Sequence, residues 1–239
     1  MRAADDFHDL GGGLFEWSAY NSAAKIDLHA HALVLPETGQ GAPGRNPRVV
    51  FLDPIALRPA ALEELLHAAG GDGNGAATPA AVLVTNGNHA RAADDFRRQF
   101  RVPVFAAGEA RAALREDGLE IDEEFPAAAA AGAADAKGSP FVGDALRAIP
   151  LPGFAHGETA IFAPHDGGTL LIGDALIYLA PPYDFVPLPK KYCTAPKITA
   201  DSLRRLLDLP PFSRMTFAHG NPLLSGAHAR LAALLHAAA

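Results

Sequence analysis

Residues 80–106 constrain the fold most, because they place a buried strand, a helix and a second strand in direct succession. The segment 80–85 (AAVLVT) is an unbroken apolar run, which is typical of a strand that is buried on both faces. Residues 90–100 (ARAADDFRRQF) have helical periodicity, and residues 102–106 (VPVFA) are apolar again. This order predicts a β-α-β unit.

The rest of the chain alternates between apolar runs and turn-forming residues. We predict strands over 14–18, 26–35, 48–52, 159–163, 169–173 and 214–219, and helices over 55–69, 200–209 and 226–239. The strands 159–163 and 169–173 flank PHDGG, which indicates a hairpin with a five-residue turn. We predict loops over 36–47 and 181–197, which are rich in proline, and a mixture of helix and loop over 107–140, with a mobile alanine-rich stretch at 127–138.

Composition excludes several classes of function. The net charge is −7 and lysine and arginine do not cluster, so the charge distribution does not favour nucleic acid or an anionic membrane as a partner. Cys193 is the single cysteine, which excludes an intramolecular disulfide and a cysteine-rich zinc site. No apolar run approaches the roughly 20 residues that span a bilayer. We therefore expect a soluble, cytoplasmic protein with one domain over 1–239, as a monomer or homodimer.

Four segments, taken in order, resemble the metallo-β-lactamase superfamily. The strand 80–85 ends in threonine and continues as 86–91 (NGNHAR), where the family has H-x-H-x-D-H. The turn 152–158 (PGFAHGE) stands where the family has P-G-H-T-P-G-S. A strand ending in Gly-Asp supplies Asp174, and a strand ending in His-Gly supplies His219. The resemblance covers roughly residues 14–235, and T-N-x-x-H-x-R in place of the histidine motif points to a divergent subgroup.

The resemblance implies the fold. Members of this superfamily are α+β proteins that form a four-layer αβ/βα sandwich, in which two mixed sheets pack face to face with helices outside. The strands and helices predicted from the local pattern agree with this architecture, because strands are followed by helices in each half of the chain.

The resemblance also implies where metal ligands would lie, and most of those positions have changed. One family site corresponds to Asn86, Asn88 and Phe154. An amide is a poor zinc ligand and a phenyl ring is none. The second site corresponds to Ala90, Arg91, Asp174 and His219, so two of its ligands remain.

A buried carboxylate needs a partner for its charge, which raises the question of what pairs with Asp174. Arg91 and Asp174 both correspond to ligands of one ion in the family. We therefore expect the Arg91 guanidinium to replace the metal charge and to donate a bidentate pair of hydrogen bonds to Asp174.

Two functions follow from the count of ligands. In the first, the metal site is degenerate, dizinc hydrolysis is lost, no cofactor is bound, and the cleft binds a small-molecule ligand or a partner through Asn86, Asn88 and Arg91. In the alternative, the protein hydrolyses a small ester, amide or thioester. It would use one weakly bound zinc or other divalent ion at Asp174 and His219, with His89 as a further ligand or as a base.

Simpler roles remain open for the same residues. Asn86 and Asn88 are good N-cap residues for a helix starting near Ala90, and Arg91 would then be a solvated residue of its first turn. Asp174 could cap a turn, and His219 could be a core histidine bonded to a carbonyl. His29 and His31 lie two apart on one strand face, and we expect a polar sheet face there rather than a metal site. We assign no role to His156 or Cys193.

Overall fold

The computed structural model describes residues 2–36, 46–71, 75–126, 139–142, 144–178 and 184–237. The predicted mobile stretch 127–138 lies outside the described residues, as do residues 37–45 of the predicted loop and the first three residues of 181–197.

The first sheet has seven strands in the order β1-β2-β3-β4-β5-β6-β7. They are β1 (His8–Asp9), β2 (Leu14–Asn21), β3 (Ile26–Leu35), β4 (Arg48–Leu52), β5 (Thr78–Leu83), β6 (Val104–Ala106) and β7 (Glu123–Glu124). The pairs from β1 to β4 are antiparallel, whereas those from β4 to β7 are parallel. The parallel pairing of β5 with β6 across a helix confirms the predicted β-α-β unit.

The second sheet has five strands in the order β14-β11-β10-β9-β8. They are β8 (Ser139–Phe141), β9 (Leu146–Pro150), β10 (Thr159–Ala163), β11 (Thr169–Ile172) and β14 (Arg214–Phe217). The predicted hairpin is present, because β10 and β11 pair antiparallel, and β11 pairs parallel with β14. A separate ribbon joins β12 (Leu176–Tyr178) to β13 (Phe185–Pro187).

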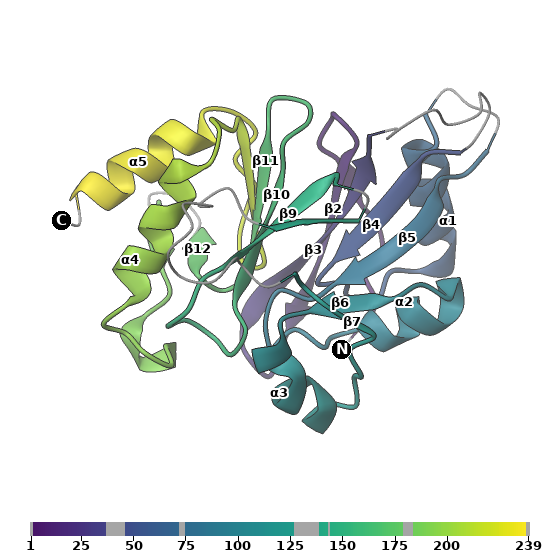
Figure 1. The fold of residues 1–239 in the computed structure, drawn as a ribbon. Coiled ribbons are helices and arrows are strands. Elements are labelled where there is room, and N and C mark those ends of the chain that lie inside the picture. Colours follow the sequence, from purple (N-terminus) through teal and green to yellow (C-terminus); the bar gives the residue numbers. More distant parts are fainter. Residues whose placement is uncertain are drawn as a thin grey trace.

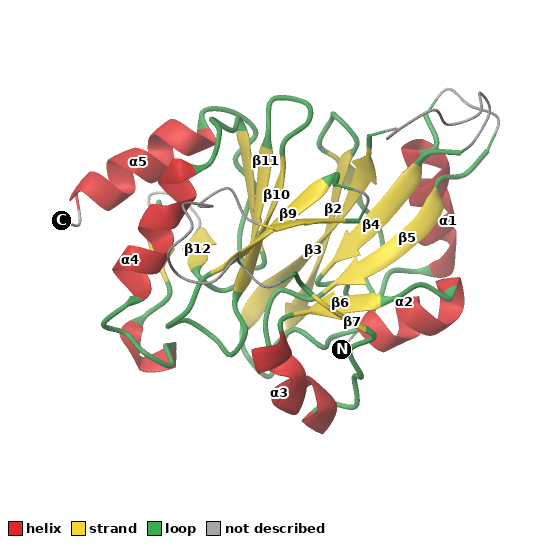
Figure 2. Cartoon of the chain, viewed as in Figure 1, coloured by secondary structure: helices red, strands yellow, loops and turns green. Residues whose placement is uncertain are grey.

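The two sheets pack face to face with helices on their outer sides (Figure 1, Figure 2). The helices are α1 (Pro59–Ala69), α2 (Ala93–Phe100), α3 (Arg111–Glu116), α4 (Thr199–Arg204) and α5 (Ala227–Ala237), with 3-10 turns at Gly108–Ala110, Lys190–Tyr192 and Arg205–Asp208. Apolar residues form one core between the sheets and one under the helices on each side. The expected α+β sandwich is confirmed. Among the described residues, no helix has the length and apolar character needed to cross a membrane.

Strand alternation distributes side chains between these cores. On β2, Leu14 faces the core between the sheets, whereas Phe15 and Trp17 belong to the core under the helices. The indole nitrogen of buried Trp17 donates to the carbonyl of Ile55 at 2.9 Å, so this large ring is fully satisfied. The first sheet is therefore fixed against the loop that leads into α1.

Two predicted helices begin later than expected. The first begins at Pro59 instead of residue 55, because proline lacks an N–H and fits the first helical turn, while Leu57 bridges to Ala4. The second begins at Ala93 instead of residue 90, because Arg91 has a left-handed φ of 38° that a helix does not allow.

The predicted loop 181–197 is also partly wrong. It contains β13 and the turn Lys190–Tyr192. Proline is tolerated in this short ribbon because β13 pairs on one side with β12 and leaves its other edge outside the main sheets.

Candidate functional site

The candidate site lies where four strands end. Asp53 follows β4, Thr85 to Arg91 follow β5, Asp174 follows β11, and His219 follows β14. Because β4 and β5 are parallel, and so are β11 and β14, the carboxyl ends of each pair meet at one edge of their sheet. The two edges face each other, so residues that are far apart in the sequence converge.

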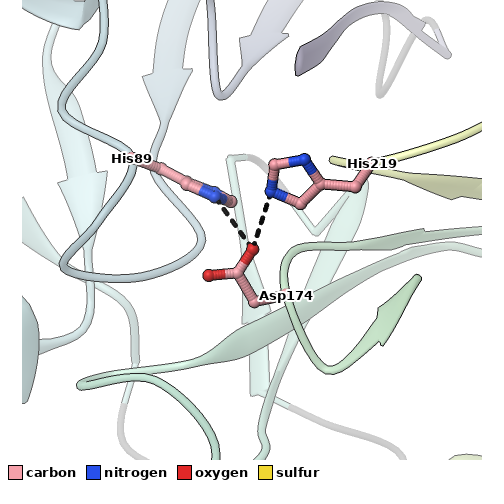
Figure 3. Close-up of side chains that lie close together, drawn as sticks. All are labelled: His89, Asp174 and His219. Carbon is pink, nitrogen blue, oxygen red and sulfur yellow. Dashed lines mark ion pairs between the residues drawn. The ribbon is translucent and has the colours of Figure 1, made fainter. Parts of the chain in front are cut away.

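Asp174 lies between two histidines from opposite sheets (Figure 3). Its Oδ1 is 3.2 Å from Nε2 of His89 and 3.1 Å from Nε2 of His219. One ligand atom from each of these three residues lies within 4.8 Å of the other two. His89 and Asp174 are buried, whereas His219 is partly exposed at the cleft.

Each histidine is oriented through its other ring nitrogen. Nδ1 of His89 is 2.8 Å from Oδ2 of Asp53, and Nδ1 of His219 is 3.1 Å from the carbonyl oxygen of Asp27. Both acceptors require an N–H, so both Nδ1 atoms carry the proton and donate it. This leaves both Nε2 atoms facing Asp174, as in metal sites where a histidine ligand donates its second N–H to an oxygen.

Asp53 fixes the loop after β5 as well as the ring of His89. Its Oδ1 accepts the backbone N–H of Thr85 at 2.8 Å, and its Oδ2 accepts the Thr85 hydroxyl at 2.5 Å. The Asp53 side chain is buried and every contact favours its ionised form. Burial opposes ionisation, but the charges of His89 and Arg91 and the hydrogen bonds hold the pKa of Asp53 below its ordinary value.

Arg91 does not pair with Asp174, so that expectation is wrong. Its Nη1 donates to the carbonyl oxygens of His29 at 2.7 Å and Asp53 at 3.0 Å, and its Nη2 lies 3.2 Å from Nε2 of His89. Arg91 (φ 38°) and Asp53 (φ 45°) both have a left-handed backbone conformation beside these contacts. The histidines take the place next to Asp174 that we expected Arg91 to occupy.

The charges at the site shift the pKa values of its members. Burial and Arg91 oppose protonation of His89, but Asp53 and Asp174 outweigh them and raise the pKa of His89 to about 9. Burial opposes ionisation of Asp174, but His89 and His219 hold its pKa well below the ordinary value. The two carboxylates thus favour the protonated form of His89, and the two histidines favour the ionised form of Asp174.

Asn86 and Asn88 do not cap the helix, and that alternative is wrong. The residue before α2 is Ala92, and no side chain caps its N-terminus. Oδ1 of Asn86 accepts the backbone N–H of Asn88 at 2.8 Å, while Nδ2 of Asn88 donates to Oδ2 of Asp174 at 3.2 Å. Asn88 therefore holds the oxygen of Asp174 that the histidines do not contact.

Glu158 is a buried residue next to the site, and its sequence pattern did not predict a role for it. Nδ2 of Asn86 donates to its Oε2 at 2.8 Å, and the backbone N–H of Ala175 donates to its Oε1 at 3.0 Å. Burial and the nearby charge of Asp174 raise the pKa of Glu158 to about 8. Its position in the turn 152–158 was visible in the sequence, but its long-range partners were not.

A cleft of about 530 Å³ opens beside the three convergent residues. Ile26, Leu28 and Ala56 form an apolar wall, while Asn88, Arg91 and Asp95 add polar groups. Phe154, at a position where the family has a histidine, is fully buried in the core under α4 and α5 and does not line this cleft.

The residues present fit a single metal ion. Two neutral imidazoles and one carboxylate form a donor set that suits zinc and ferrous iron, and the adjoining cleft leaves room for water or substrate. His29 and His31 do not form a second set of this kind. They are buried beside Glu16, so the expected polar sheet face does not face solvent.

Solved structures resemble this chain over nearly its whole length. The metallo-β-lactamase DIM-1 has a TM-score of 0.64 and 13% identity, with 98% of this chain and 97% of that chain covered. A metallo-β-lactamase from Pontibacter korlensis has a TM-score of 0.64 and 15% identity, covering 97% of this chain and 98% of that one. The chain has the metallo-β-lactamase fold.

A third structure with this fold similarity holds metal. TTHA1623, solved in a di-iron-bound form, is 27% identical with a TM-score of 0.50, and the match covers 85% of this chain and 94% of that one. No protein-family model and no curated protein sequence matches this metallo-β-lactamase-fold chain.

Proposed function

We propose that this protein binds one divalent metal ion through His89, Asp174 and His219 and hydrolyses a small ester, amide or thioester. The observation that carries the proposal is the convergence of the three ligand atoms within 4.8 Å at the side of a cleft. Zinc hydrolases commonly use three protein ligands and leave one position open. Of the two roles that the sequence left open for His89, a further ligand or a base, the proposal takes that of the ligand.

One ion is favoured over two by the partners of the asparagines. Both polar ends of the Asn86 amide are engaged, by Asn88 and by Glu158, and the Asn88 amide holds Asp174. Phe154 is packed in the apolar core. These residues offer no second set of ligands at the positions that the family uses for its other ion.

The bound ion would supply Lewis-acid activation of a carbonyl group and of water. The chain supplies orientation: Asp53 and the Asp27 carbonyl hold the two imidazoles, and Asn88 holds the far oxygen of Asp174. Arg91 lines the cleft with its guanidinium anchored by two carbonyls, so it presents a fixed positive charge near the place where an acyl oxygen would gain negative charge. The apolar wall of the cleft would contact the acyl or alcohol portion of the substrate.

Metal analysis of protein purified without chelator tests the proposal. We expect about one equivalent of zinc, iron or manganese, and loss of that metal in His89→Ala, Asp174→Ala and His219→Ala. The exposed residue His67 provides a matched control, because His67→Ala should retain the metal. A protein without metal, or three variants that all retain it, would overturn the metal site.

Hydrolysis is tested separately on a panel of aryl esters, anilides and acyl thioesters. We expect turnover that chelation abolishes and added zinc restores. Metal binding without turnover of any of these substrates would instead support the second candidate, a ligand-binding protein in which the cleft and Arg91 hold a small molecule without reacting with it. The observation that favours this candidate is the anchored guanidinium at the cleft wall.

A further inference from the structure

The Glu158 carboxyl group bridges the two halves of the candidate site. Its Oε2 accepts from Nδ2 of Asn86, in the loop after β5 of the first sheet. Its Oε1 accepts from the backbone N–H of Ala175, in the turn after β11 of the second sheet. Glu158 is only 2% exposed, so both hydrogen bonds form away from competing water.

The direction of the Asn86–Glu158 hydrogen bond is fixed by a third residue. Oδ1 of Asn86 accepts the backbone N–H of Asn88, so the amide nitrogen is the atom that faces Glu158. Ala175 likewise presents a backbone N–H, which can only donate. The group at position 158 must therefore accept at both ends, which a carboxyl group does and a carboxamide does not.

The surrounding backbone leaves space for this carboxyl group and holds it in place. The N–H of Thr159 donates to the Thr85 carbonyl at 2.8 Å, and the N–H of Gly87 donates to the His156 carbonyl at 2.8 Å. A Cβ atom at Gly173 would lie 2.8 Å from Oε1 of Glu158 and closer still to the Thr85 hydroxyl. Glycine at 173 thus provides the space that the bridge occupies.

Both ends of the bridge adjoin proposed metal ligands. Ala175 follows Asp174 directly, and Asn86 lies three residues before His89, with its Nδ2 3.5 Å from Nδ1 of that ring. We propose that Asn86 and Glu158 are positioning residues, which hold the His89 loop and the Asp174 turn at the separation that a metal ion requires. This inference rests on the proposed metal site and adds to it a link between the sheets that contains no ligand.

Exchanging the two functional groups tests the bridge. Glu158→Gln places an N–H₂ against one of two donors, and Asn86→Asp places two carboxyl groups against each other. In the double variant Asn86→Asp with Glu158→Gln, the amide and the carboxyl group change ends, and every donor again meets an acceptor. We expect each single variant to lower zinc affinity about 10- to 100-fold and the double variant to recover to within about threefold of wild type.

Zinc affinity is measured by competition with a chromophoric chelator, with Glu64→Gln on the exposed face of α1 as the control. Hydrogen exchange of the Ala175 amide in metal-free protein gives a second readout. We expect protection in wild type and in the double variant, and faster exchange in both single variants. If the single variants disturb folding, the double variant still decides, because only a bridge between these two groups restores both readouts.

Three outcomes would overturn the inference. If the folded single variants bind zinc as tightly as wild type, the bridge does not position the ligands, although the metal site stands. If the double variant loses as much zinc affinity as the two single variants combined, Asn86 and Glu158 do not interact. If wild-type protein does not bind zinc, iron or manganese, the proposed function fails, and this inference fails with it.

Discussion

Asp174 and Glu16 are both buried carboxylates that face two histidines, but their histidines come from different parts of the fold. Asp174 meets His89 and His219, which follow strands of opposite sheets. Glu16, on β2, meets His29 and His31, which lie two residues apart on the neighbouring strand β3. A carboxylate that faces two histidines thus occurs once at a cleft and once inside the sandwich.

The geometry of the two groups differs accordingly. Oε1 of Glu16 is 2.6 Å from Nδ1 of His29 and 3.5 Å from Nε2 of His31, and none of these three residues lines the cleft beside Asp174. Of the two groups, only Asp174 with His89 and His219 brings three ligand atoms within 4.8 Å. Residue composition therefore does not define a metal site. Side chains that reach a common point from separate strand ends are also required.

The largest expected effect separates the two carboxylates directly. Asp174→Asn should lower zinc affinity on the order of 100-fold or more, because it removes the charged member of the proposed ligand set. Glu16→Gln should leave zinc affinity within about threefold of wild type, since Glu16 does not face the cleft. Chelator competition on both variants measures the difference, and equal losses would show that the two groups are not distinct.

A smaller loss is expected at the residue that orients His89. In wild type, one carboxylate oxygen of Asp53 accepts the backbone N–H of Thr85, and the other accepts the Thr85 hydroxyl and the ring N–H of His89. Asp53→Asn replaces one of these oxygens with an NH₂ group, so it cannot accept all of these hydrogen bonds, and the ring loses its fixed tautomer. We expect zinc affinity to fall about 10- to 100-fold. The ¹⁵N chemical shifts of the His89 ring should move with it, whereas Asp117→Asn, on an exposed turn, should change neither. Unchanged ring shifts in folded Asp53→Asn protein would contradict this role.

Arg91 connects the two groups, because it donates to the carbonyl of His29 and touches His89. Arg91→Lys replaces the guanidinium, whose Nη1 donates to both carbonyls and whose Nη2 contacts His89, with a single ammonium nitrogen on a side chain that is one bond shorter. We expect the free energy of unfolding to fall by about 1–2 kcal/mol. Urea denaturation measures this, with Arg98→Lys on the exposed side of α2 as a control that should change stability by about 0.5 kcal/mol or less. A loss no larger than that of the control would mean that the two carbonyl contacts contribute nothing measurable.

The smallest effect concerns the pH dependence of stability at the group of Glu16, His29 and His31. Burial raises the pKa of Glu16, but hydrogen bonds and charge interactions with His29 and His31 outweigh it and lower the pKa from 4.5 to about 2. Because the folded state holds the carboxylate more strongly than the unfolded state, this stabilisation is present above pH 4.5 and is lost as the pH falls toward 2. Between those values, Glu16→Gln should flatten the decline in unfolding free energy by on the order of 1 kcal/mol. Identical acid profiles for the two proteins would place the acid sensitivity elsewhere.

The sequence predicted the fold from patterns that are local. The apolar run 80–85 and the hairpin around PHDGG are each contained in a few neighbouring residues, and so is each of the four motifs. Helix starts were less accurate, because they depend on tertiary contacts such as the bridge from Leu57 to Ala4. The left-handed backbone of Arg91 was also not visible in a segment of good helix formers.

The site was harder to predict, because its geometry depends on contacts between distant segments. Asp174, His219 and His89 could be selected as candidates from the motifs, whereas Asp53 and Glu158 bond to residues 36 and 72 positions away. The expected Arg91–Asp174 pair failed for the same reason. Correspondence to neighbouring ligand positions in the family did not reveal which way the arginine points, and carbonyls of the first sheet attract it instead.

The hydrogen bonds between Thr85 and Asp53 affect how proteins of this fold should be classified from their sequences. Once the start of the loop is pinned, the loop can present an imidazole from its fourth position toward the opening, with no histidine at the positions that usually define it. A motif search that requires histidine at fixed positions would reject this protein as one without a metal site. Scoring the direction in which each ring nitrogen points would keep it among the candidates for metal-dependent chemistry.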